Sequence, residues 1–178
     1  MIVTRPERPE DFPAIRDLIV TTFRETYNTG ELEADLVERL RARADYDPSL
    51  ALVALDGDQI IGHVFFSRVV IAAPGGDVPA LVLAPLGVLK PYQRQGVGSR
   101  LARAGLERAR ALGYRAVFVQ GSPAYYERFG FVAGSAVGLI SPFQGVPDPV
   151  NMALEVYPGS LAGLSGRVVY PPEWDALM

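Results

Sequence analysis

A chain of 178 residues with 49% hydrophobic residues can bury one sizeable core, so we expect a single domain over residues 1–178. The chain has no cysteine and one histidine, His63, which excludes disulfides and cysteine nucleophiles and predicts that there is no metal site. The net charge of −3 gives no overall field to attract nucleic acid, and the absence of a signal peptide or a long apolar segment predicts a cytoplasmic protein that does not enter the membrane.

The first half of the sequence predicts alternating strands and helices. A short edge strand is expected at residues 2–4. Apolar residues then recur at helical spacing in residues 15–23 and again in residues 32–40, which predicts two helices. Residues 50–55, LALVAL, predict a strand, and Asp56-Gly57 predicts a tight turn into a second strand that begins at Ile60. These two strands should form an antiparallel hairpin.

The second half predicts a strand, a loop, a helix and a further strand. Residues 80–89 are nearly all apolar, as expected for a central strand, but Pro85 cannot donate to a sheet and predicts a bulge that splays the strands locally. A helix is expected from residue 97 to residue 112, and residues 116–122 predict the next strand. Because a strand, a crossover helix and a strand normally form a right-handed unit, these two strands should be parallel.

The loop between strand and helix, Gln93-Arg94-Gln95-Gly96-Val97-Gly98, is the candidate binding motif. Free N–H groups at the start of a helix and its dipole suit a phosphate or a diphosphate, and glycine allows a ligand to approach the backbone. Residues 90–115 carry one acidic residue and seven basic ones, which also favours an anion, although arginines on a helix commonly form its solvated face. The glycines could also serve only a tight turn. The motif matches neither the Walker loop nor the three-glycine dinucleotide motif.

This loop resembles the pyrophosphate loop of the GNAT family, the GCN5-related N-acetyltransferases. The segment APLGVLKPYQRQGVGSRL resembles the family's fourth strand and third helix, and YYERFGF, residues 125–131, resembles its Tyr-x-x-x-Gly-Phe segment. GHVFFS and GRVVYPPEW further resemble the bacterial YhbS-like subgroup of acetyltransferases. The resemblance implies a mixed α/β fold with helices on both faces of a twisted, mostly antiparallel sheet that has one parallel pair splayed at a β-bulge.

The resemblance also implies an acetyl-CoA-dependent N-acetyltransferase that transfers an acetyl group to a primary amine by direct attack in a ternary complex. The pantetheine arm would bind the backbone of the bulged strand as an added β-strand, and the diphosphate would bind the glycine loop. Tyr126, four residues before Gly130, would protonate the departing CoA thiolate as the catalytic acid. The residues implied to bind acetyl-CoA are Leu86, Gly87, Val88, Gln93, Arg94, Gln95, Gly96, Val97, Gly98 and Ser99.

The general base stays open because the strand at residues 80–89 contains no carboxylate. Glu25, Glu33 and His63 are the alternatives, although a lone histidine in an apolar strand is more often structural, and the amine could also lose its proton to water. The acidic first third of the chain could line an amine-binding cleft or form only a solvated surface. A small molecule and a protein are both open as the acceptor, and the oligomeric state is open, with a homodimer among the options. The alternative function is a catalytically silent acyl-CoA-binding sensor.

Overall fold

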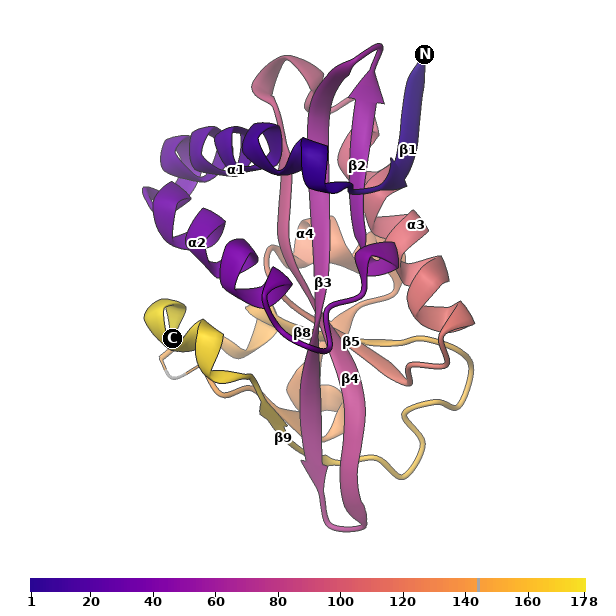
Figure 1. Cartoon of the computed structure of the whole chain (residues 1–178). Helices are drawn as coiled ribbons and strands as arrows, with labels where there is room; N and C mark the ends of the chain where they lie inside the picture. The colour runs from indigo at the N-terminus through magenta and orange to yellow at the C-terminus, as the bar shows by residue number, and fades with distance from the viewer. Residues whose placement is uncertain (144) are drawn as a thin grey trace. The chain divides into compact units, whose positions relative to one another are not determined.

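The computed structural model describes residues 1–143 and 145–178, which form two compact units. Unit 1 contains residues 1–66, 84–108 and 177, and unit 2 contains residues 67–83, 109–176 and 178. Two long strands, β3 (Gln59–Ala73) and β4 (Gly76–Val88), lie side by side (Figure 1). Each of them contributes residues to both units. That the whole chain acts as a single domain stays a prediction.

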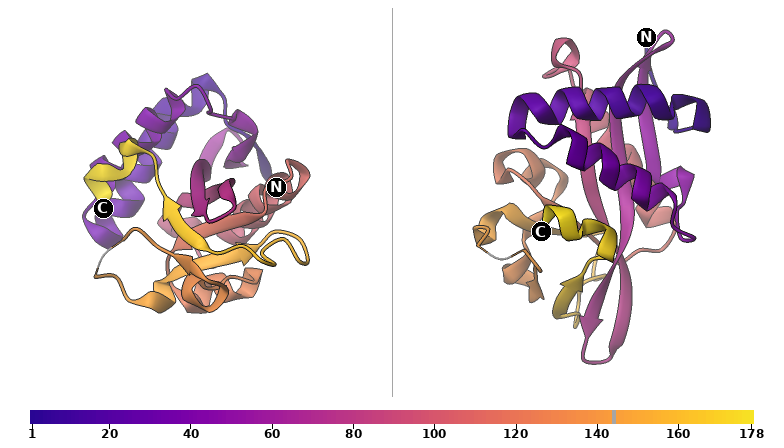
Figure 2. Two further views of the ribbon diagram at one scale, coloured as in Figure 1. Left: turned by 90° about the horizontal axis from the view of Figure 1, so that it is seen from below. Right: turned by 60° about the vertical axis from the view of Figure 1, so that its left-hand side comes forward.

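The α-helices of unit 1 form where the sequence predicts them. They are α1 (Phe12–Tyr27), α2 (Gly30–Arg41) and α3 (Val97–Ala111), whose last three residues belong to unit 2. The short 3₁₀ helices are η1 (Pro9–Asp11), η2 (Pro48–Leu50) and η3 (Lys90–Tyr92). Helices α1 and α2 lie side by side (Figure 2), and Arg16 of α1 pairs with Glu31, Asp35 and Glu38 of α2. The apolar faces of both helices are buried, with Ile15 and Leu36 completely inaccessible.

The strands of unit 1 confirm the predicted hairpin. β1 (Ile2–Pro6) pairs antiparallel with β2 (Ala51–Asp56), which pairs antiparallel with β3. The turn at Asp56-Gly57 joins β2 to β3, and Gly57 takes the left-handed conformation that the turn requires, at φ +59°. The register of β2 and β3 shifts between Ala54 and Leu55.

Helices cover both faces of this part of the sheet. Successive strand residues point to opposite faces, so Gly62 and His63 of β3 mark the two sides. A β-carbon at Gly62 would lie 3.0 Å from Cδ1 of Leu101 in α3, so Gly62 lets α3 approach the strand closely. The ring of His63 instead contacts Glu7, which pairs with Arg41 of α2.

Unit 2 contains the parallel pairing. Leu81 and Val82 of β4 pair in parallel register with Val117 and Phe118 of β5. The remaining elements are β5 (Ala116–Gln120), α4 (Pro123–Tyr126), η4 (Glu127–Phe129), β6 (Val132–Ala133), η5 (Gly134–Val137), β7 (Leu139–Ile140), η6 (Asp148–Val150), β8 (Asn151–Glu155) and β9 (Gly166–Val169). Residues 172–177 form η7 (Pro172–Leu177).

The strand order confirms the predicted mixed sheet. Within the described residues, nine strands form one sheet, in which seven pair in the order β1-β2-β3-β4-β5-β8-β6 and β9 pairs with both β3 and β7. Along this path, the pairs β1–β2, β2–β3, β5–β8 and β8–β6 are antiparallel, whereas β4 and β5 are parallel. The two-residue strand β7 adds a second, short parallel pair with β9. The parallel pairing lies just before Pro85, whose peptide bond with Ala84 is cis. A bulge at Pro85 stays a prediction.

Candidate functional site

The glycine loop leads from β4 through η3 into α3. Arg94 and Gly96 both take left-handed backbone conformations, at φ +60° and +82°, so the chain turns sharply twice before the helix. The Gln93 side-chain amide donates to the carbonyl of Val88 at 2.9 Å, and that of Gln95 donates to the carbonyl of Pro91 at 2.7 Å. These two hydrogen bonds, both made by the loop's own side chains, stabilise its conformation.

The helix that follows the loop begins with free donors. The N–H of Arg100 donates to the carbonyl of Gly96 at 2.9 Å, which is the first bond of the α3 ladder. The N–H groups of Val97, Gly98 and Ser99 precede that bond and have no partner further back in the helix. Because Gly96 is exposed and nothing lies within 4 Å of the place where its β-carbon would be, the loop is open to a ligand. Its backbone suits an anion such as a diphosphate.

The predicted pantetheine segment, residues 86–88, lies against α1 within unit 1. Gly87 is buried, and a β-carbon at this position would lie 3.1 Å from Cδ2 of Leu18 and 3.7 Å from Cβ of Thr22. The carbonyl of Val88 accepts the Gln93 side chain, so the segment and the glycine loop are directly connected. The structure therefore brings together the residues that the sequence predicts to bind acetyl-CoA in this unit.

Tyr126, the predicted acid, lies in unit 2 at the end of α4. Its ring covers Gly121, where a β-carbon would overlap Cε2 of the ring, so only glycine fits beneath it. Phe131 packs edge-on against the Tyr126 ring with a centroid separation of 5.6 Å, and Tyr125 does so at 4.9 Å. The guanidinium of Arg128 lies 4.6 Å from the centre of the Tyr125 ring. Both tyrosines are half-buried, and packing fixes the plane of the Tyr126 ring.

The three candidate bases have different surroundings. Glu25 is exposed, whereas Glu33 of α2 is half-buried, and no hydrogen bond or ion pair reaches its carboxylate from the described residues. Burial raises the pKa of Glu33 to about 7, a value suited to a general base at neutral pH. His63 is completely buried, and burial lowers its pKa while Glu7 opposes that effect.

His63 belongs to a buried polar cluster that the sequence did not reveal. Arg41 donates twice to the carboxylate of Glu7, at 2.8 Å each, and the Tyr46 hydroxyl donates to it at 2.7 Å. Nε2 of His63 lies 2.9 Å from Oε2 of Glu7. Burial alone would raise the pKa of Glu7, but hydrogen bonds from Arg41 and His63 outweigh it and lower the pKa to about 2. This cluster connects the segment after β1 to α2 and β3.

The acidic first third of the chain contributes to an open cleft of about 520 Å³ within unit 1. Helix α1, the turn between β2 and β3, and Leu89 line this cleft. Its charged lining residues are Arg5, Glu10, Asp11, Asp17 and Asp58. Arg5 and Asp11 neutralise each other in a bidentate pair, at 2.6 and 2.9 Å, so the remaining charge of the cleft is negative.

The described residues contain no group of three or more His, Cys, Asp or Glu side chains that could hold a metal ion. None of the helices in residues 1–143 and 145–178 has the length and apolar character needed to cross a membrane.

Comparison with known proteins agrees with this geometry. The model of the acetyltransferase (GNAT) family matches residues 12–131, which include α1, the glycine loop and Tyr126. The chain belongs to the GNAT acetyltransferase family. The uncharacterized N-acetyltransferase YhbS of Escherichia coli is 34% identical over 170 residues, covering 95% of this chain and 96% of YhbS. The uncharacterized N-acetyltransferase YjhQ of Escherichia coli strain K12 is 40% identical over 99 residues, but these span only 55% of YjhQ.

Two solved GNAT structures are similar over nearly the whole chain. The crystal structure of Escherichia coli YhbS in complex with CoA has a TM-score of 0.84 and 33% identity, covering 98% of this chain and 92% of that one. The crystal structure of a GNAT family acetyltransferase from Brucella melitensis in complex with acetyl-CoA has a TM-score of 0.77 and 30% identity, covering 98% and 99%. The predicted family and fold are therefore confirmed.

Proposed function

We propose that this protein is an acetyl-CoA-dependent N-acetyltransferase that acetylates a primary amine by direct attack in a ternary complex. The observation that carries the proposal is the similarity, over 98% of the chain, to two GNAT proteins solved with CoA and with acetyl-CoA. The free N–H groups at the start of α3 would hold the diphosphate, and the backbone of residues 86–88 would pair with the pantetheine arm.

The reaction requires that one proton is removed from the amine and that one proton is supplied to the leaving thiolate. The amine nitrogen bonds to the thioester carbonyl carbon as the carbon–sulfur bond breaks, and the CoA sulfur leaves as a thiolate. In this proposal, Tyr126 protonates that thiolate, whose pKa resembles the value of about 8.5 of a cysteine thiol. No residue has to carry the acetyl group, which agrees with a chain that has no cysteine.

Glu33 is our choice for the general base. Its carboxylate is without a partner among the described residues, and its pKa of about 7 places both protonation states near neutral pH. His63 is completely buried and bonded to Glu7, so we assign it a structural role. Glu25 is exposed to solvent, so we do not assign it this role.

The proposal includes a cytoplasmic location and leaves both a small molecule and a protein open as the amine acceptor. It also leaves open whether the protein forms a homodimer. The alternative is a GNAT domain that binds an acyl-CoA without turning it over, and the absence of a carboxylate from residues 80–89 is the feature that favours this alternative.

Ligand-induced stabilisation and initial-rate kinetics test the proposal. Because a ligand that binds only the folded state raises the melting temperature, acetyl-CoA should raise it more than ATP or NADH at equal concentration. Initial rates measured against both substrates should give intersecting double-reciprocal lines, as a ternary complex requires. Parallel lines would indicate a covalent acetyl-enzyme and contradict direct attack.

A further inference from the structure

Glu7, Arg41, Tyr46 and His63 form a buried cluster that joins three elements of unit 1. Glu7 follows β1, Arg41 ends α2 and His63 lies in β3, so the cluster connects α2 to the strands. The side chains of Glu7 and His63 are completely inaccessible, and that of Arg41 is 8% exposed. Solvent therefore screens a charge here only weakly, and the protonation state of each group affects how α2 packs on the sheet.

The cluster is electrically balanced while the His63 ring is neutral. The carboxylate of Glu7 carries one negative charge, and Arg41, which donates to both of its oxygens, carries one positive charge. The Tyr46 hydroxyl is a neutral donor, because burial and the neighbouring carboxylate raise its pKa. A proton on His63 would give the cluster a net positive charge, and burying an unpaired charge costs free energy.

The groups around the cluster do not compensate for that charge. Asp11 attracts a positive charge at His63, but both of its oxygens accept hydrogen bonds from Arg5, at 2.6 and 2.9 Å. Phe65, two residues along β3, presents an apolar ring whose centroid lies 6.2 Å from that of the His63 ring. Among the described residues, Glu7 is the only carboxylate that pairs with His63, and Arg41 already neutralises it.

Protonation would also leave the other ring nitrogen without a partner. Nδ1 of His63 is buried and has no hydrogen-bond partner within the part of the chain that the structure describes. We therefore assign the proton of the neutral ring to Nε2, which donates to Glu7 at 2.9 Å. A second proton would create a buried N–H at Nδ1 that has no acceptor. Both costs agree with the pKa of His63, which burial lowers more than Glu7 raises it.

We propose that the cluster is a pH-sensitive switch, which stabilises the packing of α2 on the sheet while His63 is neutral and opens when His63 takes up a proton. In the open form the ring is solvated and has the pKa of about 6.5 of an exposed histidine, whereas in the closed form its pKa is lower. The stabilisation is therefore complete above about pH 6.5 and is lost as the pH falls below that value. Each further pH unit raises the ratio of open to closed forms by up to about tenfold. The switch does not depend on the proposed acetyl transfer, and none of its tests requires turnover.

NMR spectroscopy of the wild type tests the charge state of the ring directly, because His63 is the only histidine of the chain. Protein without an affinity tag is titrated from about pH 8 to about pH 5.5 while the carbon and nitrogen signals of the imidazole ring are recorded. In the folded protein the ring should stay neutral over this range, whereas in the urea-unfolded chain it should titrate near about pH 6.5. A folded-state ring that titrates within this range overturns the proposal. The measurement needs no variant, so it decides the proposal even if a substitution at His63 prevents folding.

The pH dependence of unfolding measures the switch, but Glu33 acts in the opposite direction. Because burial raises the pKa of Glu33 to about 7, its uptake of a proton stabilises the folded protein as the pH falls. Glu33→Gln removes this effect and is the reference. In the double variant Glu33→Gln/His63→Gln, the new amide at position 63 can donate to Glu7 but does not titrate. From about pH 7.5 to about 5.5, the unfolding equilibrium constant should rise about tenfold more in Glu33→Gln than in the double variant. An equal pH dependence in the two variants overturns the switch.

Hydrogen exchange locates the opening. In Glu33→Gln, over the same pH range, the amide N–H groups of residues 36–41 in α2 should exchange about tenfold faster after correction for the intrinsic effect of pH. Residues 101–108 of α3, on the opposite face of the sheet, are the control and should show no such increase. Mass spectrometry of peptic fragments measures both. An equal increase in the two helices would mean that they open together, and it would contradict a switch at α2.

Discussion

Nε2 of His63 lies 2.9 Å from Oε2 of Glu7, with both side chains completely buried. Nδ1 of His63 is also buried and has no hydrogen-bond partner among the described residues. A protonated ring would leave a buried N–H at Nδ1 without an acceptor, whereas a neutral ring with its proton on Nε2 donates to Glu7. The cluster is therefore an ion pair of Glu7 with Arg41, supported by a neutral histidine and a tyrosine hydroxyl.

The first prediction concerns the stability contributed by this cluster. Glu7→Gln should reduce the free energy of unfolding by about 3–5 kcal/mol, because it leaves the Arg41 charge buried without a partner. Glu38→Gln removes an exposed partner of Arg16 and should change the free energy of unfolding much less, because solvent screens an exposed ion pair. Denaturant unfolding at pH 7 measures both. A loss below about 1 kcal/mol in Glu7→Gln would mean that the pair is not a structural element.

The main elements and the glycine loop were predictable because they follow from local patterns. Helical spacing in residues 15–23 and 32–40 predicted α1 and α2, and the Asp56-Gly57 turn predicted the β2–β3 hairpin. The loop before α3 was predictable because both a turn and the start of a helix depend mainly on residues that are adjacent in the sequence. The predicted end of α3 differs from the observed end by one residue, since Gly113 at φ +80° stops the helix just after Ala111.

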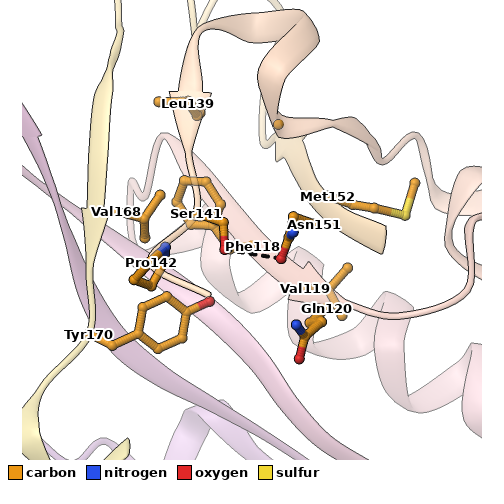
Figure 3. Close-up of a pocket in the computed structure, with 11 residues that line it drawn as sticks. Phe118, Val119, Gln120, Leu139, Ser141, Pro142, Asn151, Met152, Val168 and Tyr170 are labelled. Carbon is orange, nitrogen blue, oxygen red and sulfur yellow. Dashed lines mark hydrogen bonds between the residues drawn. The ribbon is translucent and has the colours of Figure 1, made fainter. Parts of the chain in front are cut away.

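Two other features depend on contacts between distant residues and were missed. Glu7 and His63 are 56 positions apart, and neither has a sequence pattern that predicts their contact. A small pocket at the end of β5 (Figure 3) is likewise lined by residues that lie between positions 118 and 170 of the sequence. The two-residue strands β6 and β7 were not predicted either, because they are too short to show an alternating pattern.

The second prediction tests the general base. Glu33→Gln should lower kcat/KM and remove the fall in activity at low pH. If ionised Glu33 accepts the amine proton, wild-type kcat/KM should rise as the pH is increased through about 7. Below that pH kcat/KM should fall, because protonation of the Glu33 carboxylate removes the base. Glu25→Gln is the exposed control and should keep the wild-type profile. A profile that is unchanged in Glu33→Gln would show that another group or water accepts the proton.

The third prediction concerns the start of α3. Gly98→Val should weaken CoA binding by at least about tenfold, because a branched side chain would obstruct the free N–H groups that are proposed to bind the diphosphate. Gly98 lies within the helix, so its substitution avoids the left-handed strain that a side chain at Gly96 would add. Titration calorimetry measures the affinity, with Glu107→Val as the control for valine in an exposed position of α3. Normal CoA binding by Gly98→Val would mean that the loop serves only as a turn and does not bind the diphosphate.

The fourth prediction concerns the hydroxyl of Tyr126. Tyr126→Phe keeps the ring over Gly121 and against Phe131, so folding and CoA affinity should be retained. Turnover should fall by a factor on the order of 10² to 10⁴ if protonation of the thiolate limits the chemical step. Tyr125→Phe alters the adjacent ring and should keep near wild-type turnover. Pre-steady-state rates establish whether chemistry is limiting, and unchanged turnover under that condition would remove Tyr126 from the mechanism.

The most direct test of acetyl transfer is the stoichiometry of its two products. Purified wild-type protein is incubated with acetyl-CoA and a panel of primary amines. The free thiol of CoA is measured with a colorimetric thiol assay, and the acetylated amine is measured by mass spectrometry. We predict that thiol and acetylated amine form in equal amounts, well above the rate without protein, and that Gly98→Val lowers both together. Tight CoA binding with no acetylated product from any amine in the panel would contradict the enzymatic account and favour the acyl-CoA sensor.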